Sequence, residues 1–174
     1  IAYYVKRVQG GVGYITFEHT GIVKEGKASP GMALIDGDDK TPLFRKLVDA
    51  VHREGGRFFI QINHAGRQTS ASITGSPVVA PSPIPCPVRK EMPHPLSVEE
   101  IRGLVEAFRQ AARRVKEAGA DGVEVHMAHG YLLCQFLSPF SNRRDDEYGG
   151  APEKRMKMPL EVLRAVRGTV GPDF

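Results

Sequence analysis

The sequence predicts an α/β fold with a parallel sheet, and three observations support this prediction. Apolar, β-rich runs alternate with amphipathic helical stretches along the 174 residues, and repeated strand–helix units form parallel sheets with right-handed crossovers. No Gly-x-Gly-x-x-Gly or Walker motif follows any of these runs, which argues against the nucleotide-binding doubly wound folds. Three strands can be identified, and because a (β/α)8 barrel takes about 250 residues, the chain could supply about half of a barrel.

The first half of the chain contains two strands with a helix between them. Residues Val12–Phe17 form an apolar, β-rich run, which predicts a buried strand. Thr41 is the predicted N-cap of the helix, with Pro42 at the first helical position and Gly55-Gly56 at the end. The apolar face of this helix consists of Phe44, Leu47, Val48 and Val51. Residues Phe58–Ile62 are the second predicted strand.

A proline-rich segment follows the second strand. Seven prolines lie between Pro77 and Pro95, both included, so this stretch cannot be a central helix or strand. A loop of this length inside a compact domain is usually functional or lid-like. The alternation of strands and helices resumes after it, so we interpret the segment as a loop within one domain and not as a linker.

A well-marked helix start follows this loop. Ser97 and Glu100 have the spacing of a capping box, and Leu96 and Ile101 have that of a hydrophobic staple. Apolar residues then recur at helical spacing until Gly119, which is expected to end the helix.

The third strand is predicted at Gly122–His126, and a last helix is predicted from about Pro152 to Val170 with a kink at Pro159. Between them, Ser141–Gly150 form a dense polar loop whose charges alternate well enough for internal ion pairs. We interpret these residues as a scaffold that orders the loop above the barrel, in preference to a direct catalytic role.

Composition and charge exclude several classes of protein. The formal net charge of +4 is spread along the chain, so there is no nucleic-acid footprint. No apolar stretch approaches the ~20 residues of a membrane-spanning helix, and the first residues lack the pattern of a secretory signal. Two cysteines do not make a disulfide framework, which favours a reduced, cytoplasmic compartment. The chain starts at Ile1 and ends at Phe174, and we expect both ends to be cut from a longer protein.

Each predicted strand leads into polar residues. Glu18-His19-Thr20 follow the first strand, Asn63–Gln68 follow the second, and His126–Tyr131 complete the third. In parallel α/β folds the chemistry sits at the carboxyl ends of the strands. Gln61, inside the apolar second strand, is interpreted either as an amide bonded to neighbouring backbone or as a group that recognises a flat heterocycle with mixed donors and acceptors.

His126 and His129 are three residues apart at the end of the third strand. They could bind a metal, act as general acid and base, or donate two hydrogen bonds to one substrate oxygen. Few companion ligands are nearby and no His-Glu-x-x-His motif is present, so we expect no metal site. Tyr131 is a candidate proton donor. The structural alternative is a histidine bonded to backbone and a tyrosine in the core.

Four motifs combine in a specific order and spacing: Gln61–Arg67, Asp121–Leu132, Gln135–Pro139 and Asn142–Gly150. Together they resemble the old yellow enzyme family of NADH:flavin oxidoreductases and ene-reductases, including the related domain of 2,4-dienoyl-CoA reductases. The likeness extends over essentially the whole chain. The resemblance implies a (β/α)8 barrel that holds FMN at the carboxyl ends of its strands, with residues 1–174 supplying about strands two to four and their helices.

By position, the resemblance implies roles for five residues. Gln61 matches a glutamine that binds the flavin ring, and His19 falls at a strand end whose backbone lies near the flavin. His126 and His129 match the pair that binds the activating oxygen of the substrate. Tyr131 matches the tyrosine proposed as proton donor.

The resemblance implies a ping-pong reaction. NADH or NADPH reduces FMN and leaves, and an α,β-unsaturated carbonyl compound then accepts a hydride at its β-carbon. Tyr131 or water protonates the α-carbon. The larger members of the family also carry an iron–sulfur cluster and FAD, which would lie downstream of this chain.

The resemblance also implies that parts of the barrel lie outside the chain, including a flavin-contacting turn before Ile1 and phosphate-binding loops after Phe174. We therefore expect the isolated chain to bind FMN weakly or not at all and to be inactive. Half a barrel has two unpaired strand edges, which predicts self-association into homo-oligomers. The alternatives are a metal-dependent hydrolase that uses His126 and His129 on a similar barrel, and a non-catalytic half-barrel.

Overall fold

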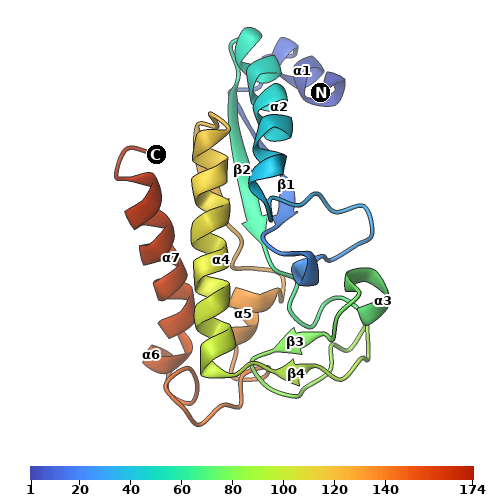
Figure 1. Ribbon diagram of the computed structural model, residues 1–174, viewed down its shortest axis with the longest axis vertical. Helices are drawn as coiled ribbons and strands as arrows, with labels where there is room; N and C mark the ends of the chain where they lie inside the picture. Colours follow the sequence, from blue (N-terminus) through green and yellow to red (C-terminus); the bar gives the residue numbers. More distant parts are fainter.

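A three-stranded parallel sheet forms the centre of the structure, and part of it is visible beside the long helices in Figure 1. The computed structural model describes residues 1–174, and its sheet contains β1 (Tyr14–Gly21), β2 (Arg57–Asn63) and β5 (Gly122–Val125) in the order β1-β2-β5. Both neighbouring pairs of strands are parallel. The three predicted strands are therefore confirmed, although β1 continues beyond its predicted end at Phe17.

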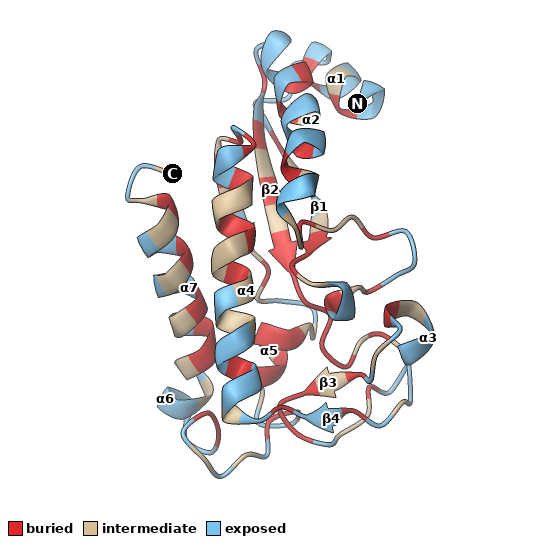
Figure 2. Ribbon diagram, in the orientation of Figure 1, coloured by how far each residue is buried: buried red, intermediate tan, exposed pale blue.

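Helices cover one face of this sheet. The long ones are α2 (Thr41–Arg53), α4 (Val98–Glu117) and α7 (Lys157–Val170), and α1 (Ala2–Gln9) precedes β1. Phe58, Ile60 and Ile62 of β2 are fully buried in the core beneath them, whereas Phe59 and Gln61 on the other face are only half-buried. Figure 2 shows buried residues along the helices, interleaved with exposed ones. One face of the sheet thus packs against helices, and the other face, which would line a barrel, is open.

Short elements gather at the carboxyl ends of the strands (Figure 1). They are α3 (Ala71–Thr74), β3 (Val79–Ala80), β4 (His94–Pro95), α5 (Leu132–Leu137) and α6 (Pro152–Arg155), with 3-10 turns at Lys24–Gly26 and Asp38–Lys40. The predicted proline-rich loop contains β3 and β4, which pair in parallel over two residues each. Arg67 anchors this loop, because its guanidinium donates to the carbonyls of Ile84 (2.9 Å) and Pro85 (3.2 Å).

The predicted start of α4 is confirmed. The Ser97 hydroxyl accepts from the Glu100 N–H (3.2 Å), and the Glu100 carboxylate accepts from the Ser97 N–H (2.7 Å), which completes the capping box. Leu96 and Ile101, the predicted staple, are both buried in the main core. No helix in the structure has both the length and the apolar composition needed to cross a membrane.

The predicted N-cap of α2 is wrong. Lys40 occupies that position, and Thr41 is the first residue of the helix. The 3-10 turn before α2 leads directly into it, so Lys40 already has helical φ and ψ. The Thr41 hydroxyl therefore caps nothing and is buried without a hydrogen-bond partner.

The predicted kink at Pro159 is also wrong, because the helix is interrupted earlier. The stretch from Pro152 to Val170 divides into α6 and α7 at Met156. A proline ring clashes with the carbonyl four residues before it in a continuous helix, and for Pro159 that residue is Arg155, the last of α6. Pro159 consequently lies in the first turn of α7, where its missing N–H costs nothing.

β1 contains a bulge where it approaches the polar end of the sheet. Phe17 and Thr20 are three residues apart in β1, but their partners in β2 are only two apart. Glu18 and His19 therefore lie opposite a single residue of β2. Bulges are rare in parallel sheets and often re-aim a side chain next to a functional site. Here the His19 ring is directed to the inner face, where its Nδ1 lies 3.1 Å from the Asn63 amide nitrogen.

Candidate functional site

Four of the five predicted site residues form one cluster of rings at the carboxyl ends of β1 and β5. The centroid of the His126 ring lies 4.9 Å from that of Tyr131 and 5.2 Å from that of His129, both edge to face. The His19 ring stacks on Tyr131 with centroids 5.4 Å apart and 22° between the planes. The structure thus brings residues from two strand ends into mutual contact.

A tight turn at the end of β5 carries three of these residues. The Tyr131 N–H donates to the carbonyl of Ala128 (3.2 Å) and closes the turn. Its two central residues, His129 and Gly130, both have positive φ, 55° and 71°, which is the pattern of a type I′ turn. His126 precedes the turn, His129 lies within it and Tyr131 ends it. The chain therefore gathers two imidazoles and a phenol within one short segment.

His126 is held as a neutral hydrogen-bond donor. Its Nδ1 accepts from the Ala128 N–H (3.2 Å), so the ring proton of the neutral form is on Nε2. Burial lowers the pKa of His126, and the neighbouring His129 and His19 lower it further, with a smaller opposing effect from Glu124. At neutral pH the ring thus presents a fixed Nε2–H, the form suited to donate to a substrate oxygen.

His19 joins the cluster through its side chain. The Asn63 amide nitrogen donates to His19 Nδ1 (3.1 Å), which leaves the ring proton on Nε2. Burial lowers the pKa of His19, against a smaller effect of Glu18. The Asn63 Oδ1 is buried and has no partner in the chain. A buried acceptor without a donor favours a bound group that could supply one.

Gln61, the fifth predicted residue, lies on the inner face of the sheet and outside the ring cluster. It is paired in register with Glu124 of β5, and its amide nitrogen donates to the Glu124 carboxylate. Its Oε1 accepts no hydrogen bond from the chain, so an acceptor and one N–H remain available. These two free groups of Gln61, together with the unpartnered Asn63 oxygen, fit a planar ring system with mixed donors and acceptors along its edge, as in a flavin.

Sequence reasoning missed the buried amide of Gln135, which ties two strand ends together. Its Oε1 accepts from the Arg67 N–H (3.3 Å), and its Nε2 donates to the carbonyls of Ala65 (3.1 Å) and Gly130 (2.7 Å). A Cβ atom at Gly66 would collide with this side chain. Gly66 and Gly130 were the signals in the sequence for these contacts, because a glycine often marks a place where another group approaches the backbone closely.

The polar loop is held by many internal hydrogen bonds, as expected for a scaffold. The Asn142 amide donates to the carbonyls of Phe136 and Tyr148, both at 2.8 Å. Arg144 is largely buried, donates to the carbonyl of Pro81 (2.9 Å) and pairs with Asp146, whose pKa it lowers. These contacts connect the segment after α5 to the proline-rich loop.

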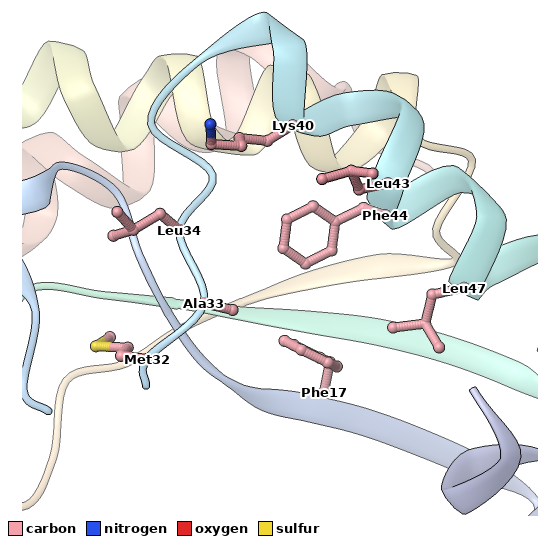
Figure 3. Close-up of a pocket in the computed structure, with 8 residues that line it drawn as sticks. All are labelled: Phe17, Met32, Ala33, Leu34, Lys40, Leu43, Phe44 and Leu47. Carbon is pink, nitrogen blue, oxygen red and sulfur yellow. The ribbon is translucent and has the colours of Figure 1, made fainter. Parts of the chain in front are cut away.

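A cavity of about 390 Å³ lies behind β1, apart from the rings. Figure 3 shows its lining residues, which are apolar except for one: Phe17, Met32, Ala33, Leu34, Lys40, Leu43, Phe44 and Leu47. It contains no acid–base pair, so it offers no chemistry comparable to that of the ring cluster. No group of three or more His, Cys, Asp or Glu side chains is arranged to hold a metal ion.

Comparison with known proteins gives consistent matches over the whole chain. The model of the NADH:flavin oxidoreductase / NADH oxidase family matches residues 1–174. An NADH oxidase of Thermoanaerobacter brockii is 46% identical over 176 residues, which cover 100% of this chain and 27% of the relative. An NADPH dehydrogenase of Listeria innocua is 41% identical over 166 residues, covering 95% of this chain and 48% of the relative.

Solved structures of similar sequence share the fold. Morphinone reductase in complex with tetrahydroNAD has a TM-score of 0.94 and 36% identity, over 98% of this chain and 51% of that one. An old yellow enzyme homologue from Zymomonas mobilis has a TM-score of 0.87 and 35% identity, over 97% of this chain and 50% of that one. The chain spans about half or less of these relatives, and the predicted partial barrel is confirmed.

Proposed function

Because the chain belongs to the NADH:flavin oxidoreductase / NADH oxidase family, we propose that it forms part of an FMN-dependent enzyme that reduces the C=C bond of α,β-unsaturated carbonyl compounds with NADH or NADPH. The predicted resemblance to old yellow enzymes is confirmed by the family match and the structural relatives. The observation that carries the specific reaction is the type I′ turn of β5, which gathers His126, His129 and Tyr131.

The two imidazoles bind and polarise the carbonyl oxygen. The fixed Nε2–H of His126 donates one hydrogen bond, and the His129 ring, 5.2 Å away between centroids, supplies the second. Two donors directed at one oxygen stabilise the negative charge that develops there when hydride reaches the β-carbon. A neutral donor at His126 does this without needing a buried counter-charge, which agrees with the lowered pKa of His126.

The phenol of Tyr131 delivers the proton to the α-carbon. Its ring is held between the stacked His19 and the edge of His126, so its direction is fixed before substrate binds. Proton transfer from a positioned side chain typically contributes about 10²–10⁴-fold to a rate.

Gln61 and His19 are the residues of this chain that would hold FMN. The free Oε1 and remaining N–H of Gln61 would meet the edge of the flavin ring, and the backbone of His19 would lie beside it. When bound there, FMN would supply the hydride chemistry, with NADH or NADPH as the reductant.

The test uses the flavin-loaded protein that contains this chain. NADPH is added without oxygen, bleaching of the flavin absorbance is recorded, and 2-cyclohexenone is then added. We expect reoxidation in the parent protein, and a loss of about 10²–10³-fold in His126→Ala with flavin reduction preserved. His94→Ala, at an exposed histidine on β4, is the matched control. Absence of flavin absorbance, or unchanged reoxidation in His126→Ala, would contradict the proposal.

A further inference from the structure

His129 adopts a backbone conformation that side chains other than glycine rarely take. Its φ is 55°, and Lys90 is the other non-glycine residue of the chain with a positive φ. In this left-handed region the Cβ crowds the following carbonyl, although histidine tolerates it better than most residues. The turn that aims His129 toward His126 therefore needs support from outside itself.

Two side-chain amides supply that support. The Gln68 Nε2–H donates to the carbonyl of His129, and the Gln135 Nε2–H donates to the carbonyl of Gly130 (2.7 Å). Gln68 belongs to the loop after β2 and Gln135 to α5. Both carbonyls of the left-handed residues are thus bound by groups that come from other parts of the chain.

The two amides differ in their other contacts. Gln135 is buried and also binds the loop after β2, so it belongs to the general packing of both loops. The Gln68 side chain is half-buried, and its bond to His129 is the one hydrogen bond it makes. A Cβ atom at Gly130 would come within 2.7 Å of the Gln68 Nε2, so this amide lies directly against the turn.

We propose that Gln68 is a positioning residue that acts through His129. By binding the His129 carbonyl, its amide fixes the peptide plane between His129 and Gly130 and hence the direction in which the imidazole leaves the backbone. Without this bond the turn can relax to negative φ, and the His129 ring moves away from His126. This inference rests on the proposed function, in which the two imidazoles share one substrate oxygen.

The expected signature is a loss of substrate binding that depends on His129. In Gln68→Ala we expect the KM for 2-cyclohexenone to rise about tenfold, because a small misplacement of a binding group is costly, while the rate of flavin reduction by NADPH stays unchanged. Gln68→Glu keeps the size of the side chain but removes the N–H donor, and it should behave in the same way. Gln9→Ala is the matched control. The exposed Gln9 amide binds Glu54, near the start of the strands and at the end of the sheet opposite to the ring cluster.

A double-mutant cycle separates positioning from a general structural effect. If Gln68 acts through His129, Gln68→Ala adds less than twofold to the KM once His129 is already alanine. Full additivity of the two effects would overturn the inference.

Histidine ring resonances measured by NMR provide a readout without turnover. The imidazole signals of His129 should shift in Gln68→Ala and Gln68→Glu, while those of the exposed His94 stay in place. Unchanged His129 signals would overturn the inference. A parent protein that fails to reduce 2-cyclohexenone, but in which the His129 signals still depend on Gln68, would contradict the proposed reaction and leave the positioning role supported.

Discussion

Burial decides the charge of His64, which lies at the end of β2 but outside the ring cluster. The side chain is 1% exposed, and its Nδ1 accepts from the Gly66 N–H (3.0 Å). Burial lowers the pKa of His64 to about 4. A histidine in an unfolded chain has a pKa of about 6.5, so over the interval between these values the unfolded chain binds a proton that the folded chain does not.

This difference predicts a loss of stability in acid. The stability that comes from keeping His64 neutral is fully present above about pH 6.5 and is lost as the pH drops toward 4. The free energy of unfolding falls by about 3 kcal/mol over this range. Urea unfolding at pH 7 and pH 4.5 measures it. His64→Gln should flatten the dependence, whereas His94→Gln, at an exposed histidine, should retain it. A profile in His64→Gln as steep as that of the parent would contradict the prediction.

A second prediction concerns the hydroxyl of Tyr131 as the proton donor. Tyr131→Phe keeps the ring that stacks on His19 and removes only the phenolic hydroxyl, the proposed proton donor. We expect reoxidation of the flavin by 2-cyclohexenone to slow by about 10²–10⁴-fold, with reduction by NADPH unchanged, as followed by stopped-flow absorbance. An unaffected rate would mean that water delivers the proton.

The sequence was informative about residues that carry their own chemistry. His126, His129 and Tyr131 could be predicted as a group because they follow one strand end within six positions. The roles of Gln68 and Gln135 could not, because each amide binds a backbone carbonyl in another loop. Gly66 and Gly130 mark places where another group comes close, but a glycine in a sequence does not reveal which side chain that is.

At the level of elements, α4 provides the most direct test of local sequence signals. Its capping box satisfies backbone groups that have no partner inside the helix. We expect Ser97→Ala to lower the free energy of unfolding by about 1 kcal/mol, measured by urea denaturation. Ser29→Ala, at an exposed serine without a side-chain hydrogen bond, is the control and should change it little. If both substitutions changed the free energy of unfolding equally, the role of Ser97 as the N-cap of α4 would be contradicted.

Element types were predictable where local forces dominate, and boundaries were not where neighbours intervene. The strands followed from apolar runs, and the start of α4 followed from side chains that cap their own helix. Thr41 failed as an N-cap because the turn before it was already helical. Pro159 predicts a kink that the structure does not have, because a sequence does not reveal whether a helix bends at a clash or ends before it.

For the whole molecule, the sheet has two edges and an open face. β1 and β5 are the outer strands of the three-stranded sheet, and Tyr14 on the inner side of β1 is 63% exposed. Unpaired edges bind other strands readily. We therefore expect the isolated chain to self-associate, with a sedimentation coefficient that rises with concentration. A monomer at high concentration would contradict this expectation.

The bulge in β1 has a consequence for how the site could change. Before the bulge, Thr16 pairs in register with Phe59 on the inner face of β2, and strict alternation would place Glu18 next on that face. The extra residue presents His19 there instead. Deletion of His19 would restore the alternation and place the Glu18 carboxylate beside Tyr131 in place of a neutral imidazole, whereas deletion of Glu18 would restore the alternation and keep the imidazole there. The charge that β1 presents to the ring cluster therefore depends on which residue the bulge accommodates as well as on the order of the side chains in the strand.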